Sequence, residues 1–141
     1  NKMSDLVNDA ERSIFLIATD PMYFDLQQRY PVFGNLMPIV KRRIAAGVRT
    51  RFVCVEPGVA REIKKELPAV EVRILDPRKP SSKIALTGGV LMVDDEEVLI
   101  NITGDMVSGD KDITAIHTRI DSIISVLRHF MEVVWDATLP V

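Results

Sequence analysis

The residues that most often carry out chemistry are few in this sequence, and they follow no common catalytic pattern. The two histidines, His117 and His129, are twelve positions apart, a spacing that is not typical of metal ligands. The single cysteine, Cys54, excludes a disulfide framework and disfavours a cysteine-based zinc site. Gly88 and Gly89 form an isolated pair without the lysine and hydroxyl of a phosphate-binding loop. We therefore predict no catalytic residue, no metal site and no cofactor.

Cys54 and the acidic run 94–97 each allow an alternative interpretation. Cys54 lies in an apolar stretch and is expected to be a small buried side chain. A reactive thiol there would need a neighbouring cation, for which Arg51 and Arg61 are candidates by sequence. The acidic run 94–97 is predicted to be a solvated turn, because consecutive carboxylates in a tight turn point outward rather than toward one divalent ion.

The bulk composition predicts a single globular domain over residues 1–141. The chain is 47% hydrophobic and 27% charged, which is typical of an ordinary folded protein. Its net charge of −2 gives no general attraction to nucleic acid or anionic lipid. No segment is long and apolar enough to span a membrane, and no signal region is recognisable, so we predict a cytoplasmic protein with no membrane partner. Because the chain opens in helix-like sequence, we expect a fragment of a longer protein.

Apolar periodicity predicts helices and strands that alternate in the first half of the chain. Helices are expected over 3–10, 36–44, 59–67 and 120–135, and strands over 13–18, 48–55, 70–75, 90–93, 98–102 and 113–117. Residues 76–82 contain two prolines and no hydrophobic residue, which predicts an exposed loop. The expected fold class is α/β, with a mixed, mostly parallel sheet flanked by helices on both faces. The first helix could pack on this core or continue a dimerising helix.

Four segments, taken in order, resemble the phospholipase-D-like superfamily. Residues 45–53, AAGVRTRFV, resemble its passage from a helix through Arg-Gly-Val into a strand. Residues 70–75, VEVRIL, are similar to its third strand, and 91–100, LMVDDEEVLI, to its hairpin containing Val-Asp. Residues 130–135, FMEVVW, resemble its Phe-to-Trp ending. The resemblance covers nearly the whole chain and implies the phospholipase-D-like fold.

The same resemblance implies that the catalytic motif is missing. Active members carry His-x-Lys just before the Val-Asp, with the histidine as nucleophile and the lysine on a phosphate oxygen. Those two positions fall at Thr87 and Gly89 in this chain. Asp94 is retained, and its implied role is to support the absent histidine. Lys83 is too far upstream to replace the lysine without a shifted alignment. The chain is therefore expected not to be an enzyme.

Non-catalytic domains of this kind occur in archaeal and bacterial transcription regulators of the TrmB type. The resemblance implies a C-terminal regulatory domain that binds a small-molecule effector and forms a homodimer. DNA would be contacted only through an N-terminal domain that this chain lacks.

A ligand pocket is expected at the carboxyl ends of the strands, where open α/β sheets bind ligands. An aromatic segment after the first strand would cover it, although the same aromatic side chains could instead cover a helix behind the sheet. The predicted ligand-binding residues are Thr19, Asp20, Tyr23, Phe24, Glu56, Thr87 and Asp94.

Two other functions remain as alternatives. A phosphodiesterase or nuclease with an atypical site, completed across a dimer, would need His117 within reach of Lys83. A pure protein-interaction module would show a large exposed apolar patch and no pocket.

Overall fold

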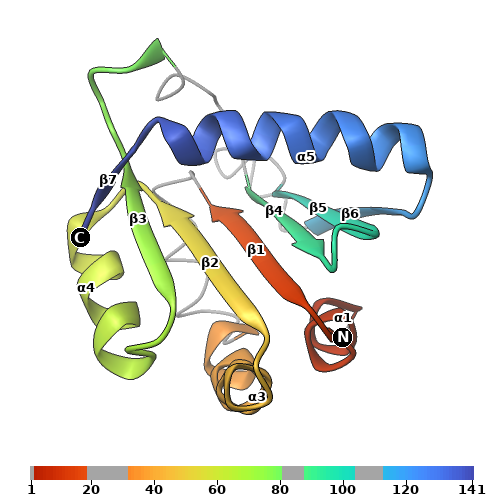
Figure 1. The fold of residues 1–141 in the computed structure, drawn as a ribbon, viewed down its shortest axis with the longest axis horizontal. Coiled ribbons are helices and arrows are strands. Elements are labelled where there is room, and N and C mark those ends of the chain that lie inside the picture. Colours follow the sequence, from red (N-terminus) through yellow and green to blue (C-terminus); the bar gives the residue numbers. More distant parts are fainter. Residues whose placement is uncertain (1, 19–31, 81–87, 104–112) are drawn as a thin grey trace.

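A single seven-stranded sheet runs through the molecule (Figure 1). The computed structural model describes residues 2–18, 32–80, 88–103 and 113–141. The sheet has the strand order β6-β5-β4-β1-β2-β3-β7. In chain order the strands are β1 Ser13–Ala18, β2 Arg49–Cys54, β3 Glu71–Leu75, β4 Gly88–Val93, β5 Glu97–Thr103, β6 Ile113–Thr118 and β7 Thr138–Pro140.

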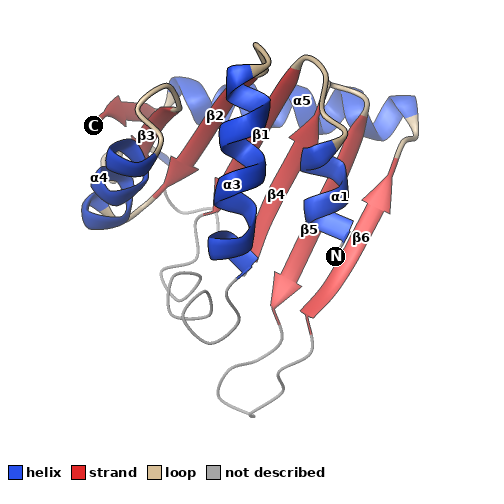
Figure 2. Ribbon diagram, turned by 90° about the horizontal axis from the view of Figure 1, so that it is seen from below, coloured by secondary structure: helices blue, strands red, loops and turns tan. Residues whose placement is uncertain are grey.

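Helices cover both faces of the sheet, as predicted. Helices α1 (Lys2–Asn8), α3 (Val32–Ala45) and α4 (Pro57–Glu66) pack on one face. Helix α5 (Asp121–Asp136) crosses the opposite face alone among the described helices (Figure 2). No helix of the described segments is long and apolar enough to cross a lipid bilayer.

The mixed α/β sheet is confirmed, but the expectation that most of its strands are parallel is wrong. Only β1–β2 and β2–β3 pair in parallel. The pairs β1–β4, β4–β5, β5–β6 and β3–β7 are antiparallel. Parallel pairing needs a crossover connection, and the alternation of helices and strands that provides it is confined to the first half of the chain. The three-residue β7 was not predicted, because so short a segment leaves no periodicity to detect.

Successive buried side chains of β1 point to opposite faces of the sheet and join two separate core clusters. Ile14 and Leu16 belong to the cluster beneath α1, α3 and α4, whereas Phe15 and Ile17 belong to the cluster beneath α5. On α1, the stripe predicted from sequence is fully buried in the first cluster: Met3, Leu6 and Val7. The structure therefore favours the core-packing interpretation of this helix over the dimerising one.

A stacked arginine joins α5 to the sheet. The Arg51 side chain is 11% exposed and forms two hydrogen bonds to the Glu132 carboxylate, of 2.6 and 3.0 Å. Its guanidinium carbon lies 3.9 Å from the ring centroid of Phe15 and 5.2 Å from that of Trp135. The hydrogen bonds from Arg51 lower the pKa of Glu132. This cluster fixes the position of α5 along the strands.

We predict that Arg51→Lys destabilises the fold by about 1–2 kcal/mol, because an ammonium cannot bind Glu132 through two parallel bonds or stack as a plane. Urea denaturation measures the loss. Arg49→Lys is the matched control, since Arg49 forms a similar two-bond pair with Glu71 but its side chain is 57% exposed. The control should change stability by less than about 0.5 kcal/mol. Equal losses in both variants would show that burial and stacking add nothing at Arg51.

Candidate functional site

The carboxyl ends of the parallel strands meet at one edge of the sheet. Ile17 pairs with Val53 near the ends of β1 and β2, and Cys54 pairs with Ile74 near the ends of β2 and β3. Strand β4 begins at the same edge, because Gly89 pairs with Ala18. Ligands of open α/β sheets bind at this kind of edge. We take it as the candidate site and call it the carboxyl edge.

One predicted ligand-binding residue is described at the carboxyl edge, and five lie outside the described residues. Glu56 follows β2 directly, is exposed, and occupies the N-cap position of α4 without a capping hydrogen bond from its side chain. Its carboxylate is therefore available to a ligand. The ligand roles of the other five remain predictions: Thr19, Asp20, Tyr23, Phe24 and Thr87.

Gly89 lies at the carboxyl edge with little room for a side chain. A β-carbon added at this position would come within 3.2 Å of the Ile17 carbonyl oxygen and 3.6 Å of Leu16 Cδ1. The first of these distances is shorter than ordinary van der Waals contact, so β1 would have to shift by a few tenths of an ångström. The glycine thus allows β4 to approach β1 closely, and it offers no functional group to a ligand.

Asp76 is a carboxylate at the same edge that sequence reasoning missed. It follows β3, and its side chain is 2% exposed, although residues 76–82 were expected to form an exposed loop. The carboxylate accepts hydrogen bonds from the Arg78 backbone N–H and from Arg78 Nε and Nη2, each 3.0 Å long. These hydrogen bonds from Arg78 lower the pKa of Asp76. The signal available in the sequence was an aspartate directly after a strand and two residues before an arginine, which favours a local Asx turn.

Asp94 lies at the opposite edge from Glu56. Ile14, at the start of β1, pairs with Val93, so Asp94 is beside the amino end of β1. The five residues from Ser13 to Ile17 separate this end from the carboxyl edge, a span of about 16 Å. The structure therefore does not bring Asp94 and Glu56 together in one pocket. It also places Asp94 too far from the start of β4 for the supporting role that the resemblance implied.

The Asp94 carboxylate instead holds the link between α1 and β1. It accepts hydrogen bonds from the backbone N–H groups of Glu11, Arg12 and Ser13, at 3.0, 2.6 and 2.9 Å. Burial alone would raise the pKa of Asp94, but the hydrogen bonds from Ser13, Arg12 and Glu11 outweigh it and lower the pKa. Asp94 and Asp95 have φ of 56° and 55°. Of the acidic run, Asp95 and Glu96 are exposed as predicted, whereas Asp94 and Glu97 are partly buried and hydrogen-bonded.

His117 is engaged away from the carboxyl edge. Its Nε2 atom lies 2.8 Å from a carboxylate oxygen of Glu97, whose other oxygen accepts a hydrogen bond from Arg119 at 2.9 Å. His117 pairs with Leu99 in the sheet. Lys83, which the phosphodiesterase alternative would bring to it, lies outside the described residues.

Cys54 matches the prediction of a small buried side chain. It is 4% exposed, and burial raises the pKa of its thiol to about 11. A thiol with so high a pKa is protonated at neutral pH and is a poor nucleophile. Among the residues that the structure describes, no three His, Cys, Asp or Glu side chains are grouped so that they could hold a metal ion.

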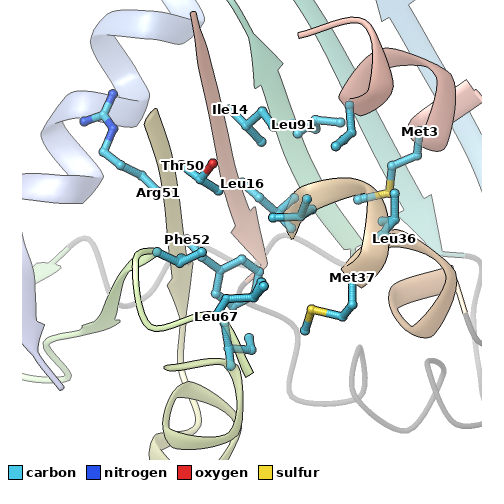
Figure 3. A pocket seen from close by; sticks show the side chains of 14 residues that line it. Met3, Ile14, Leu16, Leu36, Met37, Thr50, Arg51, Phe52, Leu67 and Leu91 are labelled. Atoms are coloured by element: carbon cyan, nitrogen blue, oxygen red, sulfur yellow. The ribbon is translucent and has the colours of Figure 1, made fainter. Parts of the chain in front are cut away.

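A small cavity lies between the sheet and the helices α1, α3 and α4 (Figure 3). Its volume is about 50 Å³, and neither Glu56 nor Asp94, the two predicted ligand-binding residues that the structure describes, lines it. The lining exposes no polar surface to the cavity, since Thr50 donates its hydroxyl hydrogen bond to the Val48 carbonyl. The described part of its lining therefore offers nothing to orient a polar ligand. Its lining includes Met3, Ile14, Leu16, Leu36, Met37, Phe52, Leu67 and Leu91.

We predict that Asp94→Asn destabilises the fold by about 1–3 kcal/mol, because an amide cannot accept from all three backbone donors. Since folding lowers the pKa of Asp94, its contribution is complete above its ordinary pKa and is lost as the pH falls through the lowered value. Denaturation at neutral and at acidic pH should show the difference between wild type and variant shrinking in acid. Asp95→Asn is the control, and it should have little effect, because asparagine also tolerates positive φ. A loss that is independent of pH would contradict this role for the carboxylate.

Comparison with known proteins identifies relatives only by structure. No protein-family model matches the chain, and no curated protein matches it. TrmBL2, an archaeal chromatin protein that binds DNA, aligns over 99% of this chain at 17% identity with a TM-score of 0.67. The aligned region is 49% of TrmBL2, so this chain spans about half its length.

Two further solved structures resemble the chain. Nuc, a phospholipase D family member from Salmonella typhimurium, aligns over 99% of this chain and 88% of its own, with 14% identity and a TM-score of 0.66. NucT from Helicobacter pylori aligns over 100% and 89%, with 11% identity and a TM-score of 0.69. All three alignments cover nearly the whole of this chain, so the chain has the phospholipase-D-like fold.

Proposed function

We propose that this chain is the non-catalytic regulatory domain of a transcription regulator, which binds a small effector at the carboxyl edge and acts as a homodimer. Its fold is shared with TrmBL2, which binds DNA, and the chain spans about half of that protein. The net charge of −2 favours DNA contact through another domain rather than through this one. The observation that carries the proposal is the glycine at position 89.

Gly89 supports a domain without phosphodiesterase chemistry. By the resemblance, an active member has a lysine at this position and a histidine two residues earlier, where this chain has Thr87. Phosphodiester cleavage of this type needs a nucleophile and a cation that stabilises the charge developing on phosphate. Neither a threonine without an adjacent base nor a glycine provides them. The tight contact between the Gly89 backbone and β1 also leaves little space for a longer side chain.

The carboxyl edge supports effector binding. Glu56 is exposed after β2 and makes no side-chain capping hydrogen bond. Asp76, after the adjacent strand β3, is 2% exposed and bound to Arg78, so Glu56 is the carboxylate that a ligand can reach. Carboxylates accept hydrogen bonds from ligand hydroxyl and amino groups. An effector that binds one dimer geometry better than another would change operator occupancy, and a coupling of about 1–3 kcal/mol is sufficient for this.

A phosphodiesterase of atypical site is the second candidate, favoured by the likeness to Nuc and NucT. It would require His117 to leave Glu97 and meet a cation in a cleft completed across a dimer. His117 lies on β6, and its Nε2 atom is 2.8 Å from the Glu97 carboxylate. This engagement favours the first candidate.

We expect the protein to hydrolyse bis(4-nitrophenyl) phosphate no faster than buffer does, because the positions of the nucleophile and the cation carry neither group. Release of 4-nitrophenolate, followed by absorbance with and without Mg²⁺, measures this. A rate that is lost in His117→Ala but kept in His129→Ala would overturn the non-catalytic proposal. The two histidines differ in place, one on β6 and the other on α5, which makes the second a matched control.

We expect a polar effector to raise the melting temperature through the carboxyl edge. At a concentration of 100 times its Kd, a ligand stabilises the folded protein by about 2.7 kcal/mol, which shifts the melting temperature by several degrees. The probes are glucose, ribose 5-phosphate and inorganic phosphate, each tested by thermal shift and calorimetry.

Glu56→Ala should weaken the effect of a probe that binds, and Glu62→Ala should leave it unchanged, because Glu62 is exposed on α4 away from the strand ends. If a bound probe stabilises both variants as it does the wild type, the site is not at Glu56.

A further inference from the structure

Large exposed apolar side chains are confined to one part of the described surface. Among the residues whose burial the structure describes, each of them lies at or beyond residue 116: on β6, just before or on α5, or in the C-terminal residues that follow. The other large apolar side chains of known burial are buried or partly buried. A concentration of this kind marks an interaction surface rather than the scattered exposure of an ordinary protein. The residues are Ile116, Ile120, Ile123, Val126, Val133, Leu139 and Val141.

On α5 the exposed apolar residues follow the spacing of a helix–helix seam. Ile123, Val126, Phe130 and Val133 are separated by three, four and three residues, which is the a/d spacing of paired helices. Ile123, Val126 and Val133 are 41%, 69% and 48% exposed, and Phe130 is partly buried. We call these four residues the outer seam.

A second stripe with the same spacing holds α5 on the sheet. Each member of this inner stripe follows a member of the outer seam by one residue and contacts the core: Ile124, Leu127, Met131 and Val134. The helix therefore presents two neighbouring apolar stripes. The inner one packs on the sheet, and of the outer one only Phe130 contacts the core within the described part of the chain. An apolar stripe wider than the sheet can cover is typical of a helix that also packs on a second partner.

The arrangement of the fold leaves the outer seam accessible. Helices α1, α3 and α4 all lie on the opposite face of the sheet (Figures 1 and 2). The cluster around Arg51 holds α5 from its inner side, through Glu132 and Trp135. No other helix of the described segments packs beside α5.

We propose that the outer seam is covered by α5 of a second copy of this chain, packed antiparallel about a two-fold axis. Such an interface is isologous, so each residue and its counterpart exchange roles across the axis. With the axis near Arg128, Ile123 packs against Val133 of the partner subunit. Val126 then packs against Phe130 of the partner subunit. Both contacts join uncharged side chains, and the Phe130 ring faces the small side chain of Val126.

Charge complementarity favours this antiparallel pairing at both ends of the seam. The same register brings Arg119, just before α5, beside Asp136 of the partner subunit, and the symmetry repeats the pair at the other end. The Arg119 side chain is 63% exposed. Among the described residues, only one of its guanidinium nitrogens, Nη1, is engaged, by the Glu97 carboxylate. Antiparallel packing also sets each helix N-terminus beside the C-terminus of its partner, so that the helix dipoles attract.

The inference rests on the homodimer proposed above and names the surface that forms it. A helix of 16 residues is about 24 Å long, so the seam is a small interface. Interfaces of this size belong to transient complexes, and we expect a dissociation constant on the order of 10 µM.

Sedimentation equilibrium from about 1 µM to 500 µM, a range that brackets such a constant, tests the proposal with two variants of α5. The wild-type mass should rise with concentration from the 15.8 kDa of one chain toward twice that value. Val126→Asp should remain a monomer, because it places a charge in the seam. Ser125→Asp is exposed, adds the same charge to the same helix outside the seam, and should associate like the wild type.

The outcomes separate the failure of this surface from the failure of the homodimer. A wild type that stays monomeric throughout the range overturns both. A dimer that survives in Val126→Asp overturns the outer seam alone and leaves a homodimer formed elsewhere. Circular dichroism of both variants, each changed at an exposed position, confirms that they are folded.

Cysteine cross-linking tests the direction of the helices. The double variant Ile123→Cys with Val133→Cys should form a disulfide-linked dimer, because the antiparallel register sets these positions opposite each other. Ile123→Cys alone should not, since that position meets its own counterpart only in a parallel pair. Cross-linking of the single variant would contradict the antiparallel arrangement. The wild type serves as the background, because Cys54 is 4% exposed.

Discussion

Strand β1 is buried on both faces and paired on both sides, and the rest of the molecule is arranged around it. It pairs in parallel with β2 and antiparallel with β4, so it joins the two halves of the sheet. Its alternating side chains contribute to both core clusters, which requires helices above and below. The antiparallel pairing also fixes what lies at each end of β1. Gly89 meets its carboxyl end, and Asp94 meets its amino end.

Gly89 and Asp94 are only five residues apart in the sequence, yet this arrangement places them at opposite ends of β1, where the surroundings serve different tasks. The amino end of β1 is a structural joint, in which one carboxylate accepts three backbone N–H groups. The carboxyl end, with the exposed Glu56 nearby, has the position of a binding edge. The first task is structural, so the fold depends on Asp94 whatever groups lie at the carboxyl end.

Much of the fold could be predicted from the sequence, and the errors have physical causes. The four helices of the described segments and strands such as β1 and β2 have strong periodicity, and the structure confirms them. The proportion of parallel pairs was wrong, because pairing partners are set by packing rather than by local pattern. The site was predicted less well. Asp76 was read as part of an exposed loop, since a buried carboxylate bound to Arg78 has no hydrophobic signature. Asp94 was grouped with Glu56, because separation along a strand cannot be read without the register.

The two borders of the sheet differ in their capacity to accept another strand. Strand β7 is three residues long and ends on Pro140, which pairs with Arg73 and has no backbone N–H to donate. Strand β6, over Ile113–Thr118, contains neither proline nor lysine. Edge strands without such residues are where folded proteins recruit additional chains and begin to aggregate. Conditions that favour aggregation of this domain should therefore act through the β6 border, while the β7 border is protected by its own sequence.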